Sequence, residues 1–337
     1  MRPVTPFQFV EQSAPDLPAA SAANDRRYRW STMSNDRVPR WQTMSDEERE
    51  RQYTPSTMLD GPLAPYLDAY ARRSAEAYER VDRVETIRYG PGAANTVDLA
   101  LPAATTVGGT TAPDGLLPLH VYIHGGYWQL LSKRESFFLA PDCVARGMAF
   151  AAVDYTLAPA ATLDEIVDEC VTALTALHAV APDHGVDPDS MVVSGSSAGG
   201  HLTAMTALKL PPDQRPAAVI PVSGVFELEP LIGTSINDAV GLDVERARAN
   251  SPLLHDLGNF PPSVVAFGEN EPDEFKRQSR ALVDRLLAAN RPSVEVEVTG
   301  RNHFDIVHDI ITDLVPLLPG APPTPDHEPD LPTRTEP

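Results

Sequence analysis

The chain has 337 residues, a net charge of −20 from 27 basic and 47 acidic side chains, and 42% hydrophobic residues. That length and apolar content suffice for one large globular domain and exclude fibrous, collagen-like and wholly disordered chains. A surface this acidic repels phosphates and anionic lipids, so neither nucleic acid nor a membrane surface is an expected partner.

The sequence carries no recognisable membrane or export segment. No stretch approaches the roughly 18 apolar residues of a membrane span, and the opening residues MRPVTPFQFVEQSAPD lack the apolar region of a secretory signal. We therefore expect a cytoplasmic protein. The two cysteines, Cys143 and Cys170, lie in apolar helical patterns, and we expect buried reduced thiols rather than a disulfide.

Both ends of the chain differ in composition from its middle. Residues 1–40 show no sustained periodicity and are rich in Pro, Ala, Ser, Asp and Arg, which predicts a disordered arm. The proline-rich residues 319–337 can neither continue a helix nor pair in a sheet, and a disordered tail is expected there. Between them, residues 41–82 form a predicted helical segment, with a capping-box pattern at Ser45 and a second helix over 62–80.

Residues 83–318 have the pattern of a single catalytic domain. After two strand-like runs in 84–102, apolar runs such as LPLHVYI, SMVVSGSS and SVVAFGEN alternate with helical patterns at 135–146, 163–180, 198–210, 274–290 and towards 318. Such alternation predicts an α/β fold with a mostly parallel sheet covered by helices on both faces. The irregular residues 228–257 are expected to form a lid with the residues before Tyr53, and Phe226, Leu231 and Ile232 are expected to make the pocket beneath it apolar.

A candidate nucleophile lies in the motif Gly195-Ser196-Ser197-Ala198-Gly199. The motif follows an apolar strand pattern and precedes a helical one, which is the placement that a G-x-S-x-G nucleophile elbow needs. Small flanking residues permit the strained turn that exposes the serine, here Ser197, and the helix N-terminus favours developing negative charge.

A glycine-rich loop, His124-Gly125-Gly126-Tyr127-Trp128, follows the strand pattern LPLHVYI. Backbone N–H groups in such a loop can bind an oxyanion without reorganisation of side chains. Gly126 is the favoured donor, Tyr127 a second candidate, and the N–H of Ala198 a further one. Tyr127 and Trp128 are candidate substrate contacts, although Trp128 is equally well explained as a buried aromatic anchor of the turn.

The order of a hydrolase triad on this architecture is serine, acid, histidine. Of the late histidines, His303 directly follows the strand pattern SVEVEVTGRN, at the strand end where α/β sheets place their sites, and it is the candidate base. By the same argument the acid follows SVVAFG. There Glu271 is preferred and Asp273 is the alternative, whereas Glu269 lies too close to the strand and Glu274 suits a solvated charge at a helix start.

Other chemistries have no motif in this chain. It contains no H-E-x-x-H, no paired C-x-x-C, and no phosphate-binding glycine loop after a strand, so no metal ion or nucleotide cofactor is expected.

Taken together, RQYTPS, HGGYW, DYTLAP, GSSAGGHL, GENEPDEFKRQS and GRNHFDIVHDI resemble the α/β-hydrolase fold, and more narrowly its kynurenine formamidase (arylformamidase) branch, near the hormone-sensitive-lipase-like esterases. The resemblance implies Ser197 as nucleophile, the HGGYW loop as oxyanion hole and His303 as base. The chain departs from the branch at Ser196, where a histidine is often found, and at Glu271, where the animal formamidases have aspartate.

These observations lead to one main hypothesis and two alternatives. We expect a cofactor-free serine hydrolase of a small carboxylic ester or N-acyl (formyl) amide. The alternatives are a short-chain carboxylesterase without formamidase activity, and a non-catalytic binding module on a hydrolase scaffold. The expected partner is a small-molecule substrate, and a homodimer is left open.

Overall fold

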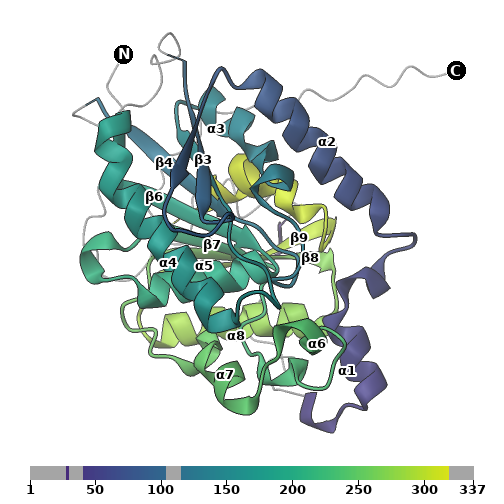
Figure 1. The fold of residues 1–337 in the computed structure, drawn as a ribbon. Coiled ribbons are helices and arrows are strands. Elements are labelled where there is room, and N and C mark those ends of the chain that lie inside the picture. Colours follow the sequence, from purple (N-terminus) through teal and green to yellow (C-terminus); the bar gives the residue numbers. More distant parts are fainter. Residues whose placement is uncertain (1–27, 30–40, 104–114, 319–337) are drawn as a thin grey trace, which may run out of the picture.

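The computed structural model describes residues 28–29, 41–103 and 115–318 (Figure 1). The predicted disordered arm, apart from Tyr28 and Arg29, and the predicted disordered tail lie outside the described residues.

Nine strands form one sheet in the order β1-β9-β8-β7-β6-β4-β5-β3-β2. The strands are β1 Tyr28–Arg29, β2 Arg83–Arg88, β3 Thr96–Leu101, β4 Leu117–Ile123, β5 Ala149–Val153, β6 Val186–Ser196, β7 Ala218–Val222, β8 Ser263–Asn270 and β9 Ser293–Asn302. Strands β4 to β9 are mutually parallel, and the hairpin β2–β3 and the short β1 add antiparallel edges. The predicted mostly parallel sheet is confirmed.

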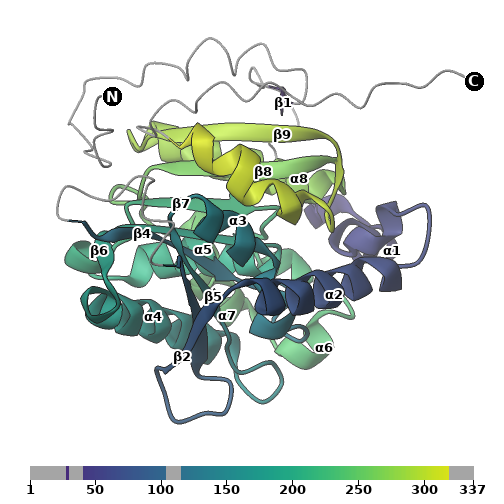
Figure 2. The same cartoon turned by 90° about the horizontal axis from the view of Figure 1, so that it is seen from above.

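Helices cover both faces of this sheet (Figures 1 and 2). They are α1 Asp46–Tyr53, α2 Ala64–Arg80, α3 Ala140–Ala145, α4 Leu163–Val180, α5 Ala198–Lys209, α6 Asn237–Val240, α7 Val244–Ala249 and α8 Asp273–Ala288. Alternate strand residues enter two separate cores, since Val121 packs in the core that contains α4, α5 and α8 whereas Tyr122 packs in the core that contains α2 and α3. Burial on both faces explains why the central strands are apolar without alternation.

Helix α4 has the bounds expected from its sequence because Thr162 and Glu165 cap each other's backbone N–H groups at its start. Two other predicted helices are broken. The segment over 135–146 consists of 3₁₀ turns at Lys133–Glu135 and Phe137–Leu139 before α3, and the last segment is a 3₁₀ turn at Ile306–Asp309, a π turn at Ile310–Leu314 and a 3₁₀ turn at Val315–Leu317. Pro141 and Pro316 lack the N–H that a continuous α-helix requires.

The fold brings the candidate site residues to one edge of the sheet. The 124–131 loop follows β4, Ser197 follows β6, Glu271 follows β8 and His303 follows β9, so all four lie beyond the carboxyl ends of parallel strands. Within the described residues, no helix is long and apolar enough to cross a membrane.

Candidate active site

Ser197 occupies a strained turn between β6 and α5. Its φ of 58° and ψ of −121° lie in a region that side chains rarely adopt, and its N–H donates to Val222 O at 2.9 Å. Glycine is required on both sides, because a Cβ on Gly195 would lie 2.3 Å from Gly199 O and one on Gly199 would lie 2.0 Å from Ile123 O. The motif's small residues therefore allow the turn that presents the Ser197 hydroxyl to the cavity described below.

His303 and Glu271 form a buried pair. His303 Nδ1 lies 3.0 Å from Glu271 Oε2, and the Glu271 side chain is fully buried. The other carboxylate oxygen, Oε1, accepts the Ser223 hydroxyl and the Gly268 N–H, both at 2.6 Å. A carboxylate can only accept, so the His303 proton resides on Nδ1 and Nε2 retains its lone pair. No hydrogen bond of the described residues joins His303 to Ser197; the two side chains meet as neighbours in one cavity.

The other three acids near the end of β8 take different positions. The Asp273 side chain is 83% exposed and faces Lys276 at 3.6 Å, and Glu269 accepts the Gly300 N–H at 2.9 Å. Glu274 corrects an expectation, because it is not a solvated helix charge. Its side chain is buried, and its carboxylate lies 2.8 Å from Arg277 Nη2. Burial by itself would lower the pKa of Arg277, but the adjacent Glu274 carboxylate raises this pKa above its ordinary value.

The loop after β4 presents backbone N–H groups beside Ser197. Gly126, Tyr127 and Trp128 have φ values of 95°, 49° and 60°, and a Cβ on Gly126 would lie 2.4 Å from Leu130 O. In the described part of the chain, the N–H groups of Gly126, Tyr127 and Ala198 have no hydrogen-bond partner. These are the three donors expected from the sequence, and Ala198 opens α5, where the helix dipole adds positive potential.

The DYTLAP segment supports this loop from behind. Tyr155 stacks on His124 with ring centroids 4.1 Å apart, and its hydroxyl donates to His124 O at 3.0 Å. The Ala158 N–H donates to Trp128 O at 2.8 Å. The positive-φ conformation of the loop is thus held by contacts outside it.

Trp128 is not a substrate contact, which corrects that part of the prediction. Its side chain is fully buried and its ring meets the His201 ring edge-on at 5.1 Å, on the core side of the loop. It is the buried anchor of the turn and does not line the cavity. Tyr127 does line the cavity.

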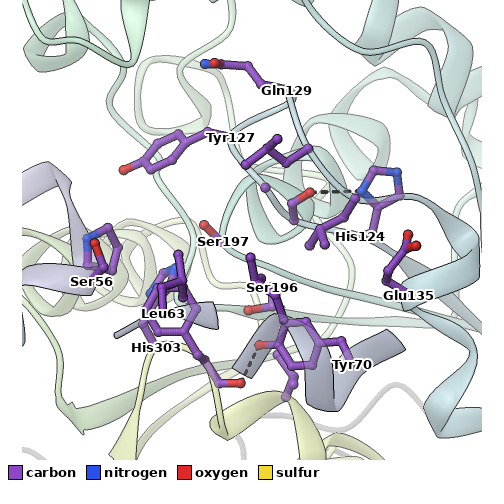
Figure 3. A pocket seen from close by; sticks show the side chains of 18 of the residues that line it. Ser56, Leu63, Tyr70, His124, Tyr127, Gln129, Glu135, Ser196, Ser197 and His303 are labelled. Carbon is purple, nitrogen blue, oxygen red and sulfur yellow. Dashed lines mark hydrogen bonds between the residues drawn. The ribbon is translucent and has the colours of Figure 1, made fainter. Parts of the chain in front are cut away.

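A cavity of about 340 Å³ lies over Ser197 and His303 (Figure 3). Much of its wall is apolar and comes from α2, the loop and the segments near residues 138 and 304: Leu63, Leu67, Tyr70, Leu130, Leu131, Phe138, Phe304 and Val307. The expected apolar contribution of Phe226, Leu231 and Ile232 is wrong, because none of them lines the cavity; Phe226 and Leu231 are fully buried in the core. The predicted lid segment 228–257 contributes Ser235 and Ile236 instead.

Tyr53 is a residue of this region that the sequence reasoning passed over. It is fully buried, its carbonyl accepts the Tyr127 hydroxyl at 2.5 Å, and its own hydroxyl donates to Glu274 at 2.8 Å and accepts from Gln278 at 2.9 Å. Burial and the Glu50 carboxylate raise the pKa of Tyr127 well above its ordinary value, so its hydroxyl stays a donor. The one available indication was that RQYTPS, which contains Tyr53, is part of the family resemblance.

Three further hydrogen bonds join segments that line the cavity. The Gln129 side chain donates to Ile236 O at 2.8 Å, and Glu50 accepts the Ser235 N–H at 2.8 Å and also its hydroxyl. The loop, α1 and the segment before α6 therefore contact one another around the opening. Within the described ranges, no group of three or more His, Cys, Asp or Glu side chains is placed to hold a metal ion.

A glycine-flanked serine at a strand-to-helix turn, beneath a loop of exposed N–H groups, defines a hydrolase of the α/β class. Residues 120–307 match the family model of the alpha/beta hydrolase fold, which covers more than half of the chain. The chain belongs to the α/β-hydrolase fold family, and the predicted class of enzyme is confirmed.

The relatives include both activities that the resemblance suggested. Kynurenine formamidase from Salmo salar is 29% identical over 282 residues, covering 78% of this chain and 91% of that protein, and an arylesterase from Saccharolobus solfataricus is 29% identical over 211 residues, covering 55% and 67%. A solved structure from Silicibacter, provisionally assigned as a thioesterase, superposes with a TM-score of 0.67 at 28% identity over 79% of this chain and 97% of that chain. The predicted relation to the formamidase branch is confirmed.

Proposed function

We propose that the protein hydrolyses a small carboxylic ester or N-acyl (formyl) amide through a Ser197–His303–Glu271 triad and an acyl-enzyme. The observation that carries the proposal is the buried Glu271–His303 pair, which leaves the imidazole Nε2 with a lone pair in the cavity that Ser197 also lines. Ser197 and His303 form no hydrogen bond within the described residues, and catalytic hydrogen bonds of this kind often form only when substrate binds.

The chemistry follows from these positions. His303 Nε2 takes the proton of Ser197 Oγ as this oxygen attacks the acyl carbon, and Glu271 stabilises the resulting imidazolium. The carbonyl oxygen becomes an oxyanion, which the N–H groups of Gly126, Tyr127 and Ala198 stabilise. The tetrahedral intermediate collapses, and His303 returns the proton to the departing alcohol or amine. Water then attacks the acyl-enzyme by the same route, which releases the acid and restores Ser197.

The cavity supports a substrate with an aryl or similar apolar group. Its wall is mostly aliphatic and aromatic, and about 340 Å³ suits a small molecule rather than a long acyl chain. The formamidase relatives span most of this chain, which favours an N-formyl aromatic amide such as N-formylkynurenine. The esterase relatives favour the alternative, a short-chain carboxylesterase.

The proposal is tested with Ser197→Ala and a matched control. Ser197→Ala should retain the wild-type melting temperature, lose labelling by a fluorophosphonate, and lose hydrolysis of p-nitrophenyl acetate and N-formylkynurenine by on the order of 10³ or more. Ser190→Ala, in the middle of β6 and away from the cavity, should change neither the labelling nor the hydrolysis. An alanine variant that still reacts with the label or turns over either substrate would refute the assignment, and a wild type that never reacts would favour a binding module.

The two substrates separate formamidase from esterase. Comparable kcat/KM values on both support the broader formulation given above. Hydrolysis of the ester alone would leave the formamidase relation as one of ancestry and favour the carboxylesterase.

A further inference from the structure

Two hydroxyl groups in the wall of the active-site cavity take no part in the proposed chemistry. One belongs to Tyr122, near the end of β4, and the other to Ser196, which ends β6 directly before the nucleophile (Figure 3). Both residues are buried, with relative exposures of 3% and 5%. Within the described residues neither hydroxyl has a hydrogen-bond partner, yet both oxygens remain accessible from the cavity. They are therefore available to a bound molecule.

The strand register places the two hydroxyls on one face of the sheet. Tyr122 lies opposite Ser194 across the β4–β6 pair, and Ser196, two residues after Ser194, directs its side chain to the same face. One row deeper on that face, His120 Nε2 lies 2.7 Å from Ser194 Oγ, so the deeper polar groups bind each other. The hydroxyls at the strand ends have no such arrangement and border the cavity instead.

The other buried polar groups of the described wall are already engaged. Apart from the nucleophile, each such side chain has a hydrogen-bond partner: Tyr70 binds Phe304 O, Ser136 binds Ser132 O, His124 Nδ1 binds Gly125 O and His303 Nδ1 binds Glu271. The second nitrogens of the histidines are not free donors, because His303 Nε2 is the proposed base and His124 Nε2 is enclosed, 3.7 Å from Asp154 Oδ1. The half-buried carboxylates of Glu50 and Glu135 only accept hydrogen bonds and so add no donor. The two hydroxyls are thus the buried donors of this wall that a ligand can use.

The surroundings of these hydroxyls favour an uncharged acceptor. Burial raises the pKa of Tyr122, so its hydroxyl keeps its proton and can donate. Its ring meets Phe138 at 6.1 Å, and Phe138 stacks on Tyr70 at 5.5 Å, which makes this part of the wall apolar. A buried donor without a partner costs free energy, so a molecule that supplies an acceptor binds better than one that does not. A carbonyl oxygen meets this need without the cost of burying a charge.

Building on the proposed function, we propose that Tyr122 and Ser196 form a subsite for a second carbonyl group of the substrate, next to the acyl group that Ser197 attacks. Consecutive Cα atoms lie about 3.8 Å apart, so the oxygen that Ser196 binds must lie close to the scissile carbonyl. An aryl ketone ortho to a formamide supplies such an oxygen. N-formylkynurenine has this arrangement, and its charged amino-acid end is not required to enter the subsite.

The test compares N-(2-acetylphenyl)formamide with N-(2-isopropenylphenyl)formamide, in which a methylene group replaces the ketone oxygen at nearly constant shape. The intrinsic reactivity of each compound is the same for every enzyme variant, so a change in the ratio of their kcat/KM values reports the contact with the oxygen. Tyr122→Phe and Ser196→Ala should each lower the ketone-to-alkene ratio about fivefold, the size of one lost hydrogen bond. The rate on the alkene should not fall, whereas damage to the fold would slow both compounds.

Ser74→Ala is the matched control. Ser74 lies on α2, and its buried hydroxyl also lacks a partner among the described residues, but it does not line the cavity. Its loss should leave the ratio unchanged. Ratios within twofold of the wild type in folded Tyr122→Phe and Ser196→Ala would overturn the inference, and so would an equal loss of rate on both compounds. If one of the two variants does not fold, as judged by its melting temperature, the other decides.

Failure of the proposed function gives a different result. If the formamides are not cleaved, the comparison is repeated with 2-acetylphenyl acetate and 2-isopropenylphenyl acetate. Turnover that depends on Ser197, with the same ratio in the wild type and in both variants, refutes the subsite alone. The absence of turnover in both series refutes the proposed function and the inference with it.

Discussion

Replacement of Glu271 by glutamine tests the orientation of the imidazole. Oε1 accepts two donors, the Ser223 hydroxyl and the Gly268 N–H, so the carbonyl oxygen of a glutamine must take that position. Its NH₂ group then occupies the position of Oε2 and faces His303 Nδ1. An amide can only donate there, and the imidazole must carry its proton on Nε2, where it cannot accept the Ser197 proton.

The size of the effect follows from this tautomer. A triad whose histidine is held in the wrong tautomer loses about 10⁴ in kcat, or about 5 kcal/mol of transition-state stabilisation. KM should change little, because Glu271 is fully buried and does not line the cavity. The assay is steady-state hydrolysis of p-nitrophenyl acetate, with the melting temperature as the check on folding.

Asp273→Asn is the matched control. The Asp273 side chain is 83% exposed, so its loss should change kcat less than twofold. A folded Glu271→Gln enzyme with kcat within tenfold of wild type would refute the tautomer argument. A large loss in Asp273→Asn would transfer the role of the acid to that residue.

Three further predictions test the supports of the site. Tyr127→Phe removes the hydrogen bond to Tyr53 and should lower kcat about tenfold with little change in KM, measured by steady-state kinetics. Gly199→Ala should destabilise the fold by about 3 kcal/mol or more in urea denaturation, whereas Gly61→Ala, with open space around its Cβ, should be nearly neutral. Burial lowers the pKa of His308 from 6.5 to about 4. Because the unfolded chain then binds a proton at higher pH than the folded one, the free energy of unfolding should fall as the pH drops from 6.5 to 4. His308→Phe should make this fall shallower, as measured by urea denaturation at each pH.

The parts of the site that follow apolar strands could be predicted from the sequence. Ser197, Glu271 and His303 each come directly after such a run, and parallel strands bring their carboxyl ends to one edge of the sheet. The bounds of α4 were predictable for a similar reason, because helical periodicity is a local pattern, and the capping box of Thr162 and Glu165 stabilises the start of this helix.

The parts that depend on distant contacts could not be predicted. Glu274 has the local pattern of an exposed charge at a helix start, but it is buried against groups that include Tyr53, 221 positions earlier in the chain. Phe226 and Leu231 are as apolar as cavity-lining residues, but both are buried in the hydrophobic core. Leu67 and Tyr70 of α2 line the cavity instead. Local hydrophobicity predicts burial without distinguishing a core from a cavity.

The position of Tyr53 has a consequence for how this enzyme can be recombined. Its carbonyl accepts the Tyr127 hydroxyl of the loop after β4, and its hydroxyl bonds to Glu274 and Gln278 on α8. The N-terminal segment is therefore an integral part of the α/β domain rather than a detachable cover. A chimaera that takes this segment from another hydrolase, in order to reshape the cavity wall, would deprive the buried Glu274–Arg277 pair of the Tyr53 hydroxyl that donates to Glu274. The N-terminal segment that contains Tyr53 and the start of α8 should therefore be exchanged together in such a chimaera.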